Sequence, residues 1–194
     1  MFQDACVIAK NQGEEGKTNY ATFLNTWATL YLTMGKYSEA EPLYMESKKL
    51  RKEEFGEMHI NYGYSLSGLG LLYRKMGRFE EAEVLFVEAK KIFKNTLGKQ
   101  SILYASACNN LAGLYLLTNK NKAAETLFLE TKAIWKEKLG EKHPSYGQIL
   151  TNIGILYHQK GNNSEAEKLY LEAKSIWESQ KQETFTSLFS YLGV

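Results

Sequence analysis

The feature that most constrains this chain is a period of 42 residues that runs through most of its length. An alanine recurs at this spacing four times, as Ala40, Ala82, Ala124 and Ala166. A unit this short cannot bury its own apolar face, so the period predicts a stack of repeats that cover one another. Four further columns keep the same register: Leu43, Leu85, Leu127 and Leu169; Tyr44, Phe86, Phe128 and Tyr170; Glu46, Glu88, Glu130 and Glu172; and Tyr31, Tyr73, Tyr115 and Tyr157.

Each period contains two amphipathic helical patterns. Leu24, Trp27, Ala28 and Tyr31 have the i, i+3, i+4, i+7 spacing that places side chains on one face of a helix. A glycine such as Gly35 then marks a helix end before the second pattern begins. The sequence therefore predicts an all-α fold of antiparallel helix pairs. The helices are expected near residues 19–33, 37–55, 60–76, 79–97, 102–118, 122–139, 145–160 and 164–179.

The ends of the repeats set the expected domain organisation. A hydrophobic residue followed by glycine separates successive pairs at Phe55-Gly56, Leu97-Gly98 and Leu139-Gly140. After the last pair Lys181-Gln182 replaces this signal, and an apolar helical pattern follows. We expect a single domain over residues 1–194, with a partial repeat at 1–16, repeats at about 19–60, 61–102, 103–144 and 145–180, and a partial repeat or capping helix at 184–192.

Composition and charge narrow the classes of partner. Lys and Arg number 24 against 22 Asp and Glu, and a net charge of +2 does not favour nucleic acid or an anionic membrane as a partner. Cys6 and Cys108 lack the paired spacing of a disulfide framework or a zinc site. The N-terminus does not read as a signal peptide, and no apolar run is long enough to span a membrane. We expect a cytoplasmic protein.

The repeat resembles the tetratricopeptide repeat, with the family signature present as Leu69, Gly70, Tyr73, Ala82, Phe86 and Ala89. The period of 42 and the segment from Asn109 to Tyr115 are similar to the kinesin light chain variety. Trp27, Cys108 and Ser101 depart from the residues that the other repeats hold in their columns. The resemblance implies a right-handed α-solenoid, a superhelix whose first helices line a concave groove that binds other proteins.

The segment from Leu169 to Trp177 is also similar to 42-residue arrays in bacterial proteins that carry caspase-like CHAT peptidase domains. This second resemblance implies an alternative function, as the regulatory or sensor segment of a larger multidomain protein. A catalytic domain in the same longer chain is then a further candidate partner. A third hypothesis is a structural solenoid that self-associates through its incomplete ends.

The candidate binding residues lie opposite the predicted packing column of Leu24, Leu66, Cys108 and Leu150. That face is mostly Ser, Thr, Asn and Gln, whose side chains can hydrogen-bond to the main chain of an extended peptide. The alternative is a polar surface with no ligand. The residues predicted to bind a peptide in the groove are Asn25, Tyr64, Arg74, Lys75, Asn109, Asn110, Gln148, Thr151 and Asn152.

Catalytic motifs are not found in the sequence. Gly98-Lys99-Gln100-Ser101 resembles the end of a phosphate-binding loop but lacks the first glycine of that motif. The three histidines have no metal-ligand spacing, so we expect no metal, no cofactor and no enzyme activity. The leading hypothesis is a protein–protein interaction scaffold that binds a protein or peptide partner, with no nucleic-acid or membrane ligand.

Overall fold

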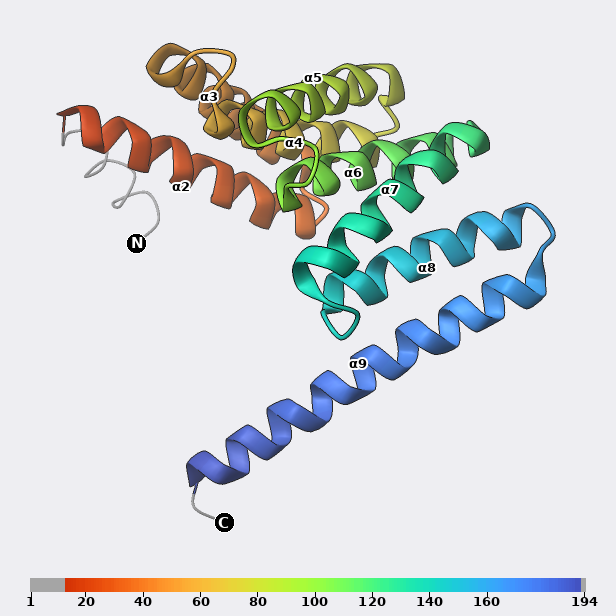
Figure 1. Ribbon diagram of the computed structural model, residues 1–194. Helices are drawn as coiled ribbons and strands as arrows, with labels where there is room; N and C mark the ends of the chain where they lie inside the picture. The colour runs from red at the N-terminus through yellow and green to blue at the C-terminus, as the bar shows by residue number, and fades with distance from the viewer. Residues whose placement is uncertain (1–12, 193–194) are drawn as a thin grey trace. The chain divides into compact units, whose positions relative to one another are not determined.

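The computed structural model describes the backbone of residues 13–192 and the side chains of residues 19–181. This part of the chain is helical and has no strand, which confirms the all-α prediction (Figure 1). The predicted partial repeat at residues 1–16 lies largely outside it. The helices are α2 (Gly13–Thr33), α3 (Tyr37–Phe55), α4 (Ile60–Lys75), α5 (Phe79–Leu97), α6 (Ile102–Leu117), α7 (Asn121–Leu139), α8 (Pro144–Gln159) and α9 (Asn163–Leu192).

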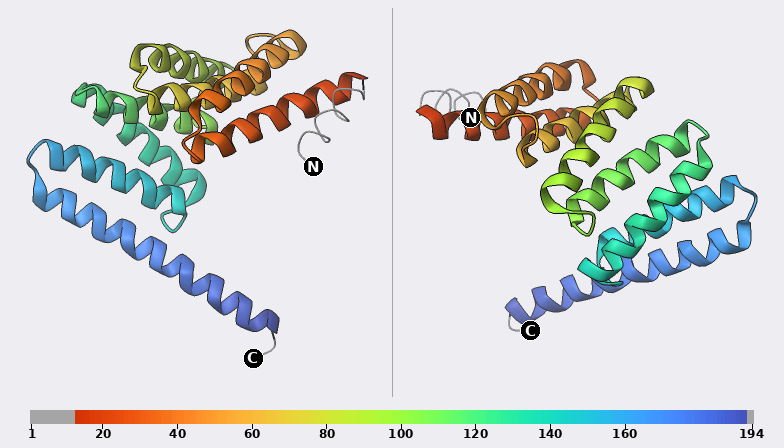
Figure 2. Two further views of the ribbon diagram at one scale, coloured as in Figure 1. Left: turned by 180° about the vertical axis from the view of Figure 1, so that it is seen from behind. Right: turned by 45° about the horizontal axis from the view of Figure 1, so that its top comes forward.

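The helices group into two compact units, Met1–Lys99 and Gln100–Val194. In the first unit α2 packs on α3, α3 on α4, and α4 on α5. In the second unit α6 packs on α7, α7 on α8, and α8 on α9. The views in Figure 2 show α8 and α9 side by side as an antiparallel pair. The single domain expected from the continuous period stays a prediction, and each unit is described separately below.

Glycines end the helices as the sequence predicts, and N-cap side chains begin some of them. Gly56, Gly98 and Gly140 follow second helices with φ of 80°, 82° and 84°, a left-handed conformation that glycine adopts without strain. The ring nitrogens of His59 and His143 accept hydrogen bonds from the backbone at the starts of α4 and α8. These histidines are therefore helix caps.

Two helices are longer than predicted. Helix α2 begins at Gly13 rather than near residue 19, and α9 continues to Leu192 without the break expected between 179 and 184. At Lys181-Gln182 the chain has good helix formers where earlier repeats have a phenylalanine or leucine followed by a glycine. The helix therefore has no local reason to end there. The side chains predicted to form the face of a separate capping helix lie outside the described part.

Small residues and aromatic rings alternate in the core. Tyr44, Phe86 and Phe128 are buried to 1%, 0% and 0% exposure. A Cβ atom added to Gly70 would lie 2.7 Å from the ring of Phe86, so the absent side chain allows α4 to approach α5 closely. Gly154 has the same relation to Tyr170, at 2.6 Å. This contact explains why one column of the repeat keeps a small residue, as Ala28, Gly70, Ala112 and Gly154. It also explains why the column of Tyr44, Phe86, Phe128 and Tyr170 keeps an aromatic ring.

Polar columns also join the two helices of a pair. The Ser47 hydroxyl donates to the backbone oxygen of Ala21 at 2.7 Å, and the Thr131 hydroxyl donates to that of Ala105 at 3.1 Å. These positions are two periods apart and make the same contact. The repeated glutamate column has a structural role as well, because the Tyr104 hydroxyl donates to Glu130 at 3.0 Å.

Candidate functional site

In the second unit, an amide pair connects the first helices of two successive repeats. Asn152 of α8 donates through Nδ2 to Oδ1 of Asn109 of α6 at 2.8 Å. Asn109 is only 9% exposed, so its side chain serves mainly to hold Asn152. The bond leaves Asn152 one amide proton and the lone pairs of its oxygen. These two predicted residues are therefore brought together, and Asn152 is the one nearer to solvent.

Three other predicted residues share these helices with the pair. Asn110 and Thr151 are half-buried and Gln148 is exposed. The Thr151 hydroxyl donates to the Gly147 oxygen of its own helix at 3.0 Å, which leaves its oxygen able to accept. We call Asn110, Gln148, Thr151 and Asn152 the amide surface.

An apolar side chain adjoins the amide surface. Ile155 follows Thr151 and Asn152 by one helical turn and is 38% exposed. The surface thus combines hydrogen-bonding groups with an apolar contact, and this is the combination that recognition of an extended peptide uses.

In the first unit the predicted residues are spread along α2 and α4. Tyr64 and Lys75 are exposed and eleven positions apart on α4, or about 16 Å along the helix axis. Arg74 is half-buried, and burial lowers the pKa of its guanidinium. Asn25 is also half-buried, and its side-chain oxygen is enclosed without a hydrogen-bond partner. The structure does not bring these four residues into one cluster.

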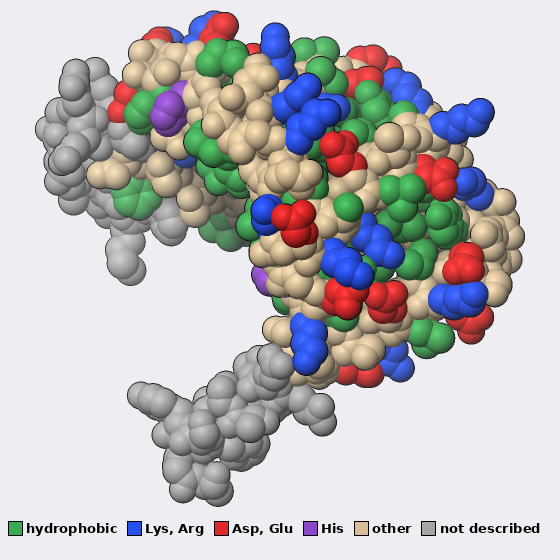
Figure 3. All heavy atoms as spheres, in the orientation of Figure 1, with side chains coloured by type: hydrophobic (Ala, Val, Ile, Leu, Met, Phe, Trp, Pro, Cys, Tyr) green, Lys and Arg blue, Asp and Glu red, His purple; other side chains and the backbone are tan. Residues whose placement is uncertain are grey.

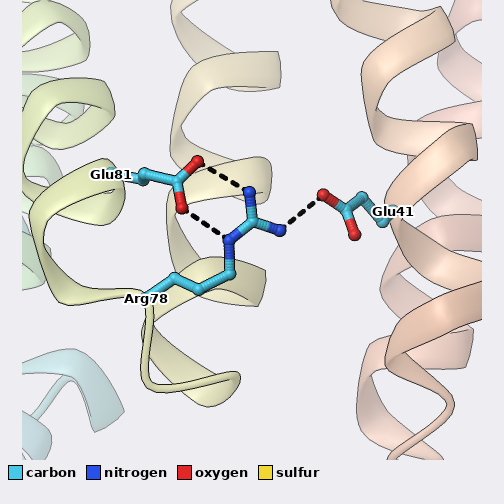
Figure 4. Close-up of polar contacts among 3 residues, drawn as sticks. All are labelled: Glu41, Arg78 and Glu81. Carbon is cyan, nitrogen blue, oxygen red and sulfur yellow. Dashed lines mark hydrogen bonds and ion pairs between the residues drawn. The ribbon is translucent and has the colours of Figure 1, made fainter.

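A second set of polar contacts, not predicted from the sequence, surrounds Arg78 at the start of α5. Its Nε and Nη2 atoms donate to the two carboxylate oxygens of Glu81, each at 2.6 Å, and Nη1 donates to Glu41 at 2.6 Å (Figure 4). Its Cζ atom lies 3.8 Å from the ring centroid of Tyr73. The Glu81 and Glu41 carboxylates raise the pKa of the guanidinium and so hold it charged. We call Glu41, Tyr73, Arg78 and Glu81 the arginine site.

A sequence signal for this site exists, because in three of the four repeats a cation follows the repeated tyrosine by five residues. The ammonium of Lys36 lies 5.8 Å from the Tyr31 ring centroid, and that of Lys120 lies 5.1 Å from the Tyr115 centroid. A comparison of the tyrosine column with the residue five positions later therefore indicates these pairs of a cation and an aromatic ring from the sequence alone.

Metal-ligating side chains are scattered among the described residues. Among these side chains, no group of three or more His, Cys, Asp or Glu residues could hold a metal ion. Cys108 is fully buried, where a thiol packs as a small apolar side chain. On the face in Figure 3, basic and acidic side chains are interspersed with hydrophobic ones. Within the described range, every helix is too short or too polar to cross a membrane.

These features define a class, an all-α repeat protein built from stacked antiparallel helix pairs. The family model of the tetratricopeptide repeat matches residues 19–95, 65–132 and 103–179. The matched ranges together cover residues 19–179, and the chain belongs to the tetratricopeptide repeat family. Repeats of this family generally mediate protein–protein interactions. A comparison with curated proteins finds no match.

Solved structures with a similar fold include kinesin light chain-like repeats. BtubC (BKLC) from P. vanneervenii has a TM-score of 0.78 and 24% identity, over 93% of this chain and 72% of that chain. The nearly identical TPR-like repeats described as a Podosopora anserina kinesin light chain have a TM-score of 0.66 and 21% identity, over 92% of this chain and 84% of that one. A variant of those repeats has a TM-score of 0.69 and 21% identity, over 93% and 84%. The likeness confirms the α-solenoid fold class.

Proposed function

We propose that this chain is a non-catalytic scaffold that holds an extended segment of a partner protein on the amide surface of α6 and α8. The observation that supports this most strongly is the bond between Asn109 and Asn152. It orients the Asn152 amide before any ligand arrives, so less side-chain freedom is lost on binding. A fixed amide can pair with both the N–H and the C=O of a peptide main chain.

The neighbouring side chains complete this mode of recognition. Asn110 and Gln148 add two further amides, and Ile155 offers an apolar contact for a side chain of the peptide. Main-chain hydrogen bonds then supply affinity, and the apolar contact supplies selectivity. Since none of these side chains carries a formal charge, we expect the interaction to depend little on salt concentration.

The test begins with a displayed library of random peptides selected on the immobilised chain. Peptides that bind are then measured by calorimetry on an Asn110→Ala, Asn152→Ala double variant. Two lost hydrogen bonds at about 0.5–1.5 kcal/mol each predict affinity weaker by about 5- to 150-fold. Equal affinity for the double variant and the wild type would refute the proposal.

The variants require a control for folding, because Asn152→Ala also leaves the buried oxygen of Asn109 unpaired. That loss is expected to cost about 1–3 kcal/mol of stability. The Asn110→Ala single variant keeps the bond between Asn109 and Asn152, so its affinity is measured separately. Thr126→Ala is the matched control, since Thr126 is exposed on α7 and bonds only to the Lys122 oxygen of its own helix. It should bind the selected peptides like the wild type.

A further inference from the structure

The second unit contains a cleft of about 410 Å³ among α7, α8 and α9. Leu129, Ile153 and Leu169 supply its apolar wall, and Tyr157 adds an aromatic ring. The carboxylates of Glu125 and Glu165 also line it, as do Lys160 and Lys132, whose ammonium lies 5.9 Å from the Tyr146 ring centroid. None of the residues of the amide surface lies in this cleft, so it is a separate site.

The cleft repeats the arginine site of the first unit at a distance of two periods. Glu125, Tyr157 and Glu165 correspond to Glu41, Tyr73 and Glu81, each 84 residues earlier. The residue that corresponds to Arg78 is Asn162, which also lines the cleft. The two carboxylates and the aromatic ring are therefore retained while the guanidinium that occupies them in the first unit is missing.

In the second unit, a lysine makes some of the contacts that Arg78 makes in the first unit. Lys160 pairs with Glu125 at 2.9 Å, and its ammonium lies 5.5 Å from the Tyr157 ring centroid. Its side chain is 41% exposed, so it can move into solvent at little cost. Glu165 bonds instead to Lys168 of its own helix at 2.9 Å, an exposed pair of the kind that exchanges readily with another cation.

We propose that this cleft binds an arginine side chain presented by a partner protein. The guanidinium would lie on Tyr157 and form two parallel bonds to Glu165, as Arg78 does with Tyr73 and Glu81. A planar guanidinium with five donors fits this combination of ring and carboxylate, whereas an ammonium cannot form both contacts in the same way. The Arg78 contacts, within the same chain, thus support arginine as the ligand of the cleft.

The chain itself is a poor source of this arginine. The sequence has three arginines, Arg51, Arg74 and Arg78. Arg51 is buried, Arg74 is half-buried and Arg78 already occupies the arginine site. A different protein with an exposed arginine is therefore the occupant that the structure favours over a second copy of this chain.

The test uses the capped peptide acetyl-Gly-Arg-Gly-amide, titrated into the ¹⁵N-labelled full chain. Because the peptide binds through one side chain, we expect a dissociation constant on the order of 1 mM, which amide chemical shifts can measure. We expect saturable shifts at Tyr157, Asn162 and Glu165, weaker binding of the lysine peptide and no shift with the uncharged citrulline peptide. No shift with the arginine peptide, or equal shifts with all three, would overturn the proposal.

Two variants test the mechanism of binding. Asn162→Arg restores the residue type of Arg78, so its own side chain should fill the cleft and abolish the shifts. Ala123→Arg adds the same charge at an exposed position of α7 outside the cleft and should bind like the wild type. Lys160→Met copies Met76, the corresponding residue of the first unit, and should strengthen binding about two- to fivefold by removing the competing ammonium.

Persistent binding by a folded Asn162→Arg variant would contradict the proposal, as would weaker binding by Lys160→Met. Thermal melts monitored by circular dichroism establish that each variant is folded. Sedimentation of the wild type tests whether a second copy of this chain, rather than a different protein, occupies the cleft. A dimer that Asn162→Arg disrupts would assign the cleft to a second copy and overturn the choice of a different protein.

Discussion

Replacing Phe86 by alanine is expected to lower the free energy of unfolding of the first unit by about 3–5 kcal/mol. The Phe86 ring is 0% exposed, and its edge lies 2.7 Å from where Gly70 would carry a Cβ atom. Alanine would therefore leave a cavity between α4 and α5, because the α4 backbone at Gly70 has no side chain to fill it. The loss is a large part of the stability of a small domain.

Urea unfolding and hydrogen exchange of the α4 and α5 amides measure this loss. Val84→Ala is the control on the same helix, since Val84 is 65% exposed and its truncation should change stability by less than about 0.5 kcal/mol. If Phe86→Ala cost no more than Val84→Ala, the ring would not be the packing centre of the pair.

Replacing Arg51 by alanine is expected to cost about 2–3 kcal/mol. This guanidinium is 7% exposed and donates to the Asn61 oxygen and to Ser65, both at 3.2 Å, and to Thr22 at 3.4 Å. Burial lowers its pKa. Alanine would remove these bonds together with the packing of the long side chain.

An aromatic residue at the same position should cost less. The other repeats have Phe93, Trp135 and Trp177 in this column, and a ring avoids the unfavourable desolvation of a buried guanidinium. Arg51→Trp should thus retain at least about 1 kcal/mol more stability than Arg51→Ala in urea unfolding. Equal losses for the two substitutions would show that the hydrogen bonds, rather than the filled volume, determine the cost.

The sequence predicts the helices and their ends well because the signals are local. The packing column of Leu24, Leu66, Cys108 and Leu150 is 0–2% exposed, as its helical spacing indicates. The breaks at Gly56, Gly98 and Gly140 need only the conformation of glycine. The period predicts a break at Lys181-Gln182, but without a glycine at this position α9 continues to Leu192.

The candidate sites depend on contacts between helices, which a periodic pattern does not specify. Helical rotation places Asn109 on the polar face, but the approach of α8 buries it against Asn152. The cleft near Tyr157 was not predicted, because a binding site there becomes evident only when its residues are compared with those around Arg78. That comparison needs side-chain geometry in addition to the sequence columns.

The most direct test of the proposed scaffold is to map a selected peptide onto the chain by amide chemical shifts. A peptide without arginine is used, so that the cleft does not contribute. The account predicts saturable shifts at Asn110, Gln148, Thr151 and Asn152, with exposed residues of α7 such as Thr126 unaffected. Shifts confined to α7 and α9, with none on α6 or α8, would contradict it.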